Sequence, residues 1–163
     1  MQGERVVDRP NVIIFFTDDQ GYGDLSCMGA TDFRTPNLDR MANDGVRFTD
    51  WYSNSPVCSP SRAALLTGRY PGNAGVRSIL RGHRRTSGLP QSSPTLATML
   101  REAGYQTAMI GKWHLGHGGI HDPTGFDYWN VLPGQGLYHD PVMHDMGTEK
   151  VFKGYATDLI TDF

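Results

Sequence analysis

The sequence predicts an α/β fold, an α/β/α sandwich with a mixed, largely parallel sheet. Two observations carry this prediction. Residues 11–17 form a largely apolar run rich in β-branched and aromatic residues, which is typical of a strand buried on both faces. Further along, a capped helix pattern over residues 93–103 leads directly into an apolar strand pattern over residues 105–110, as in a helix–strand unit.

The composition fits one globular domain and excludes two kinds of partner. The chain has 163 residues, of which 38% are hydrophobic and 20% are charged, and its formal net charge is −2. No basic run is longer than Arg84-Arg85, so the sequence lacks the clustered basic patch of a nucleic-acid-binding protein. No stretch approaches the ~18 apolar residues of a membrane span. Two cysteines, Cys27 and Cys58, leave the redox compartment open.

The first ten residues are polar and charged, and we predict an N-terminal extension over residues 1–10 before a domain over residues 11–163. These ten residues contain no apolar region of the kind found in a signal peptide. The compartment therefore stays open: it is cytoplasmic, or periplasmic or secreted if a leader is missing.

The first predicted strand ends in two adjacent carboxylates, Asp18 and Asp19. The carboxyl end of a parallel strand is where open α/β sheets bind their ligands. Helix signals follow over residues 35–42, with Pro36 at the first helical position and a glycine just beyond the end. Residues 46–52 then predict a second strand.

The next stretch joins a thiol to the start of a short helix. Cys58 precedes Pro60, a residue tolerated in a first helical turn, and good helix formers follow up to Gly68. Backbone N–H groups and the helix dipole favour an anion at such a point, and Arg62 adds a fixed positive charge. The stretch predicts a site for chemistry on sulfate or phosphate. The alternative is a buried structural thiol.

A long loop and a well-capped helix follow. Residues 71–90 show no sustained periodicity and predict the loop. In the helix over residues 93–103, we expect Ser93 to be the N-cap and Pro94 the first helical residue. The strand over residues 105–110 then leads to a second ligand-binding edge.

Lys112 and His114 follow that strand, and on an extended segment their side chains point to one face. A lysine there can neutralise an oxyanion, and a histidine can donate to an oxygen of the nucleophile or leaving group. A structural histidine is the alternative. Residues 116–141 predict a loop and residues 154–163 an amphipathic helix. The chain stops on an apolar residue without a cap, so we expect a C-terminally truncated domain.

Two kinds of metal site can be considered. Asp18 and Asp19 supply hard oxygen ligands, which favour Ca²⁺ over Zn²⁺, with Mg²⁺ as a less favoured alternative and a solvated turn as another. His114, His117 and His121 have a spacing that invites a zinc interpretation. Three glycines among them break the helix that this spacing needs, so we do not favour zinc.

Three segments together resemble the type I, formylglycine-dependent sulfatases, which have an alkaline-phosphatase-like fold. Residues 58–69, beginning Cys-Ser-Pro-Ser-Arg, resemble the first signature of that family, and residues 104–114 resemble its second. Residues 11–24 are similar to its opening strand and metal-binding aspartate pair. The resemblance covers about residues 10–163. Residues 126–141 are similar to bacterial sulfatases that act on sulfated carbohydrates, including those resembling N-acetylglucosamine-6-sulfatases.

The resemblance implies that the chain takes part in hydrolysis of a sulfuric ester. Cys58 would be oxidised to formylglycine by a formylglycine-generating enzyme that recognises the Cys-x-Pro-x-Arg core. One hydroxyl of the hydrated aldehyde would attack sulfur, and the second would expel sulfate. Asp18 and Asp19 would ligate Ca²⁺ together with an oxygen of residue 58. The other matching positions are Arg62, which would hold the diol, and Lys112 and His114, which would bind the diol and sulfate oxygens.

The chain also departs from the family pattern. Family members supply further metal and substrate ligands from later segments, and nothing after His144 matches these. We therefore expect an N-terminal fragment with an exposed apolar face or sheet edge and half of an active site. Substrate contacts are expected from residues 77–85 and 134–140. The alternatives are a phosphonate monoester hydrolase or phosphodiesterase of the same superfamily, and a non-catalytic remnant that binds an anion or glycan.

Overall fold

The computed structural model describes residues 9–81, 88–116 and 118–163. Most of the predicted N-terminal extension lies outside these residues, as do Arg84, Arg85 and His117. The chain divides into two compact units, Met1–Trp51 and Tyr52–Phe163.

The first unit contains a 3-10 turn, η1 (Ser26–Met28), and one helix, α1 (Pro36–Asp44). The helix predicted over residues 35–42 is thus confirmed, with Pro36 in its first turn and a glycine as its C-cap. Asp39 of α1 joins the two elements. Its Oδ2 accepts a hydrogen bond from the Ser26 hydroxyl at 2.6 Å, and its Oδ1 accepts one from the Cys27 N–H at 2.8 Å. The bond from Ser26 is the main reason that the pKa of Asp39 lies below its usual value.

The two strands predicted in and beside this unit, over residues 11–17 and 46–52, do not form, so these predictions are wrong. Both segments are exposed: Ile13 is 76% and Phe15 78% accessible. A strand exists only where a neighbour accepts and donates its backbone hydrogen bonds, and the described residues of this unit include no strand. The expectation of an exposed apolar surface is confirmed.

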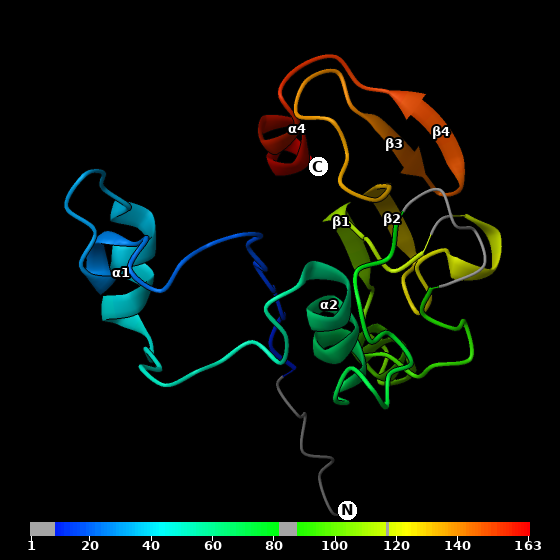
Figure 1. Cartoon of the computed structure of the whole chain (residues 1–163), viewed down its shortest axis with the longest axis horizontal. Helices are drawn as coiled ribbons and strands as arrows, with labels where there is room; N and C mark the ends of the chain where they lie inside the picture. Colours follow the sequence, from blue (N-terminus) through cyan, green and yellow to red (C-terminus); the bar gives the residue numbers. More distant parts are fainter. Residues whose placement is uncertain (1–8, 82–87, 117) are drawn as a thin grey trace, which may run out of the picture. The chain divides into compact units, whose positions relative to one another are not determined.

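The second unit contains a sheet in the order β1-β2-β3-β4, with helices around it (Figure 1). Its elements are, in chain order, α2 (Cys58–Thr67), α3 (Leu96–Glu102), β1 (Ala108–Lys112), η2 (Gly119–His121), β2 (Tyr128–Leu132), β3 (Val142–Asp145), β4 (Thr148–Val151) and α4 (Ala156–Asp162).

The sheet is mixed, which confirms the predicted α/β fold. β1 pairs with β2 in parallel, in a register that places Lys112 opposite Leu132. The pairs β2–β3 and β3–β4 are antiparallel. Parallel pairing puts the carboxyl ends of β1 and β2 at the same edge. The prediction of a loop over residues 116–141 is wrong where β2 lies. The strand was missed because its flanks are rich in glycine and proline.

The core of this unit lies between α2 and the sheet. Ala63 of α2, Trp113, Trp129 and Val131 belong to one buried apolar cluster. The Trp113 ring meets the ring of Phe126 edge-on at 6.5 Å between centroids, an arrangement that aromatic pairs prefer. Burial of these side chains fixes α2 against the sheet, and with it the residue at the start of α2.

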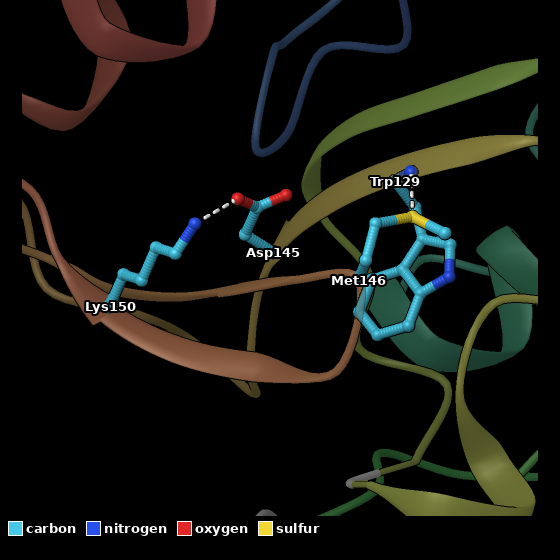
Figure 2. Close-up of polar contacts among 4 residues, drawn as sticks. All are labelled: Trp129, Asp145, Met146 and Lys150. Carbon is cyan, nitrogen blue, oxygen red and sulfur yellow. Dashed lines mark hydrogen bonds and ion pairs between the residues drawn. The ribbon is translucent and has the colours of Figure 1, made fainter.

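The β3–β4 hairpin is closed by a two-residue turn, Met146-Gly147, in which both residues have positive φ. Met146 continues the pairing with β2. Its N–H donates to the Trp129 carbonyl at 3.0 Å, and its sulfur accepts the Trp129 N–H at 3.1 Å (Figure 2). Across the hairpin, Nζ of Lys150 lies 2.5 Å from Oδ2 of Asp145. This hydrogen-bonded ion pair raises the pKa of the lysine and lowers the pKa of the aspartate.

The helix near residue 95 begins later than expected. Thr95, not Ser93, is the N-cap of α3, and its hydroxyl accepts the Thr98 N–H. Thr95 is buried and its hydroxyl also contacts the Thr124 carbonyl, so tertiary packing selects this cap. The following strand, β1, is shifted toward Lys112 by two to three residues. The C-terminal helix predicted over residues 154–163 is confirmed as α4.

None of the helices in the described part of the chain is long and apolar enough to cross a membrane.

We expect Gly125→Ala to destabilise the protein by about 3 kcal/mol. Gly125 has a φ of +86°, and a Cβ there would lie 2.5 Å from the Thr98 nitrogen, which is backbone of α3 and cannot move aside. Gly72→Ala is the control, because a Cβ at that position meets nothing within 4 Å. Its expected change is within about 0.5 kcal/mol. Urea unfolding of the two variants measures the difference, and equal midpoints would contradict this account of Gly125.

Candidate active site

Cys58 is the first residue of α2, which confirms that the thiol lies at a helix entrance. The thiol is half-buried and forms no disulfide. Val57, the N-cap, offers no polar side chain, and the first turn contains no acidic residue. The positive end of the helix dipole is therefore not offset by a carboxylate within that turn, as an anion-binding position requires.

Arg62 joins α2 to the end of β1. Its side chain is buried, with 6% of the residue accessible, and its Nη1 donates a hydrogen bond to the Lys112 carbonyl at 2.6 Å. This contact links residues 50 positions apart in the sequence. It uses one of the five N–H donors of the guanidinium. Because the acceptor is a neutral carbonyl, this bond does not itself pair the positive charge that Arg62 carries in α2.

A second connection runs from α2 to His114 through the backbone of Leu80. The buried Ser59 hydroxyl accepts the Leu80 N–H at 3.1 Å, and Nε2 of His114 lies 2.8 Å from the Leu80 carbonyl. A carbonyl only accepts, so Nε2 carries the proton. His114 is 3% accessible and has a φ of 51°. The prediction that Lys112 and His114 alternate on an extended segment is therefore wrong, since the backbone turns at His114.

A pocket of about 370 Å³ opens beside His114. The Lys112 ammonium donates a hydrogen bond at 2.6 Å to Oε1 of Gln135, one of the pocket's lining residues. The lining residues are Ile79, Leu80, Arg81, His114, Pro133, Gly134 and Gln135. Of the predicted site residues, His114 lines this pocket, Lys112 contacts its lining residue Gln135, and Arg62 contacts the Lys112 carbonyl.

The aspartate pair lies in the other unit. Asp18 and Asp19 are exposed, and Asp19 has a φ of 54°, within the left-handed region. Adjacent carboxylates suit a hard cation such as Ca²⁺, but Ca²⁺ takes six to eight oxygens. No group of three or more His, Cys, Asp or Glu side chains forms a metal site among the described residues. Of the histidines considered for zinc, the buried His121 has its Nδ1 3.3 Å from the Leu89 carbonyl.

The family model described as Sulfatase matches residues 10–163. The chain belongs to the sulfatase family.

Named relatives within the sulfatase family act on carbohydrates. The chain is 44% identical over 157 residues to N-acetylglucosamine-6-O-sulfatase of Bacteroides thetaiotaomicron, covering 94% of this chain and 26% of that protein. It is 45% identical over 133 residues to human N-acetylgalactosamine-6-sulfatase, covering 76% of this chain and 26% of that protein. The chain therefore spans about a quarter of the length of these relatives.

Solved sulfatase structures have the same fold. One, in complex with its substrate D-glucosamine-2-N,6-O-disulfate, matches with a TM-score of 0.83 and 44% identity, over 94% of this chain and 30% of that chain. This agreement confirms the alkaline-phosphatase-like α/β fold that the resemblance implied.

Leu80 and Gln135, which line the pocket, fall within the segments 77–85 and 134–140 from which substrate contacts are expected, but sequence reasoning did not single out either residue. Leu80 acts through its backbone, so no sequence signal marks it. Gln135 stands between two glycines directly after β2. A polar residue in a glycine turn at the carboxyl end of a strand would have been a signal, had β2 been predicted.

We expect Arg62→Met to lower the free energy of unfolding by about 2 kcal/mol, because the charge-assisted bond to the Lys112 carbonyl is lost and the carbonyl loses its donor. Arg69→Met is the control: Arg69 is exposed just beyond the end of α2, and its expected change is within about 0.5 kcal/mol. Denaturant unfolding measures both. Equal stability of the two variants would show that the Arg62 contact contributes nothing.

Proposed function

We propose that the whole protein is a sulfuric ester hydrolase that removes sulfate from a sulfated carbohydrate, and that residue 58 acts as formylglycine. The observation that supports this most directly is that the helix beginning with Cys58 is connected to the other two matching residues. Arg62 of this helix donates to the Lys112 carbonyl. The Ser59 hydroxyl and Nε2 of His114 bond to the backbone of Leu80, beside a pocket that His114 lines. Two positive side chains and a helix N-terminus suit a tetrahedral, negatively charged group.

Each of these residues has a task that follows from its chemistry. Arg62 is buried and bonded to the Lys112 carbonyl, so its guanidinium is held in place before any ligand arrives. Lys112 is half-buried and offers an ammonium to sulfate oxygens. His114 is held by the Leu80 carbonyl through the Nε2 proton, which leaves the imidazole oriented at the pocket wall. Its task is to bind an oxygen of the substrate or of residue 58.

The metal proposal concerns Asp18, Asp19 and the modified residue 58. These would hold Ca²⁺, with Mg²⁺ as the less favoured ion. When bound, the ion would supply the charge that lowers the pKa of an oxygen nucleophile. The two carboxylates suit a hard cation, and the remaining oxygen ligands would come from outside the described residues.

Conversion of Cys58 requires a partner, a formylglycine-generating enzyme that recognises residues 58–62. Ser59, Pro60 and Arg62 are buried in α2. We therefore propose that the modification precedes folding, while this segment is still accessible.

The substrate proposal follows the relatives. Two of them are named for the 6-sulfates of N-acetylglucosamine and N-acetylgalactosamine, and a solved structure holds a 6-O-sulfated glucosamine. We propose a 6-sulfated amino sugar as the substrate class.

In the full-length protein made in a competent host, the peptide containing residue 58 is expected to be lighter than its thiol form by ~18 Da, as the oxidation of the thiol to an aldehyde requires. Cys58→Ala is expected to abolish hydrolysis of N-acetylglucosamine-6-sulfate, while Cys27→Ala, which changes the other free thiol, retains it. Mass spectrometry and sulfate release measure the two effects. An unmodified Cys58 would favour the non-catalytic remnant, and faster hydrolysis of a matched phosphate ester would favour the phosphoesterase alternative.

The 163-residue chain by itself is expected to bind Ca²⁺ weakly and not to hydrolyse an aryl sulfate. Two adjacent carboxylates supply few of the six to eight oxygens that Ca²⁺ needs. Calorimetric titration with Ca²⁺ and an aryl sulfate assay, after verified conversion of Cys58, test this. Clear turnover by the isolated chain would contradict it.

A further inference from the structure

The turn after β2 presents one side chain to the candidate site in a fixed way. Gly136 N–H donates to the Pro133 carbonyl at 3.1 Å, so Pro133 to Gly136 form a closed turn with Gly134 and Gln135 at its centre. Gly134 and Gly136 have φ of +56° and +72°. At position 136, a Cβ would lie 3.1 Å from Cδ2 of Leu132, the last residue of β2. Glycine on both sides lets this turn lie close against the strand, with Gln135 projecting from it.

Gln135 meets Lys112 because β1 and β2 are parallel and in register. Lys112 and Leu132 are opposite each other at the ends of the two strands, so the turn that follows Leu132 lies beside Lys112. Oε1 of Gln135 accepts a hydrogen bond from Nζ of Lys112 at 2.6 Å. Lys112 is therefore held at both ends, its carbonyl by Arg62 and its ammonium by Gln135.

A neutral amide is a suitable group for this contact. A lysine side chain has several rotatable bonds, and its ammonium is a point charge that needs a fixed partner to stay in one place. The amide oxygen provides that partner without cancelling the positive charge. A carboxylate at the same position would form an ion pair and oppose the approach of an anion.

We propose that Gln135 is a positioning residue that sets where the Lys112 ammonium lies when an anionic group binds. That this anion is a sulfate ester rests on the proposed function. Gln135 itself also lines the pocket, so the same turn shapes the opening and directs the charge.

Two variants separate position from charge. Gln135→Met keeps the length of the side chain but removes the strong acceptor, and Gln135→Glu keeps an acceptor but adds a negative charge. The control is Gln91→Met. Gln91 is also an exposed glutamine with a hydrogen bond, from its Nε2 to the Gly119 carbonyl at 3.0 Å, and it does not line the pocket. Thermal unfolding of the full-length protein checks that each variant is folded.

The first readout does not depend on enzyme activity. The full-length protein is labelled briefly with acetic anhydride, and the labelling rate of Lys112 is measured by mass spectrometry relative to the exposed Lys150 and Lys153. We expect Lys112 to react about threefold faster in Gln135→Met, because the ammonium loses the Gln135 acceptor, and more slowly than the native residue in Gln135→Glu, because a carboxylate pairs with the unreactive ammonium form. Gln91→Met should leave the rate unchanged.

The second readout is hydrolysis of N-acetylglucosamine-6-sulfate by the same proteins. We expect kcat/KM to fall about tenfold in Gln135→Met and further in Gln135→Glu, with the larger part of each effect in KM, since the ammonium acts on the bound anion. Unchanged labelling of Lys112 in Gln135→Met overturns the proposal whatever the activity. Equal kcat/KM in the two Gln135 variants overturns the role of the charge. If labelling changes as expected but the native protein hydrolyses no sulfate ester, the contact stands and the proposed function fails.

Discussion

The hydrogen bond from Arg62 to the Lys112 carbonyl is the contact on which the candidate site depends. It connects the helix that begins with Cys58 to the end of β1, and it does so inside the protein, where a guanidinium must be hydrogen-bonded to be stable. The choice of a backbone carbonyl as acceptor matters. A carboxylate would have satisfied the same donor and cancelled its charge. With a carbonyl, the bond fixes α2 on the end of β1 without itself pairing the charge of Arg62.

A second backbone group, that of Leu80, also makes two contacts in the candidate site. The backbone of Leu80 bonds to Ser59 through its N–H and to His114 through its carbonyl, so one loop residue fixes both a helix and a ring. Because the carbonyl requires a proton on Nε2, it also selects the tautomer of His114. The conformation of a loop thereby determines which nitrogen of the imidazole could accept a proton.

Local signals in the sequence predicted α1, α2 and α4, because proline, glycine and apolar periodicity act within a few residues. These local signals failed for the strands, because a strand forms only where a neighbouring strand pairs with it. Residues 11–17 have the composition of a buried strand but are exposed, whereas β2, with a fully buried Asn130 at its centre, lies in a stretch whose composition predicts a loop. In the site, the residue types of Arg62 and Lys112 were recognisable from the signatures. Their mutual contact was not, because it spans 50 residues and depends on the packing of α2.

The proposed metal site and the proposed ester site need ligands of opposite charge. Asp18 and Asp19 together carry two negative charges, which equal the charge of one divalent cation. The further ligands of such a cation can therefore be neutral oxygens. An anionic ester instead needs donors and positive charge, which we propose that Arg62 and Lys112 supply. Residue 58 is the position proposed to take part in both, because an oxygen there can be a metal ligand and a nucleophile, whereas a thiol favours softer metals.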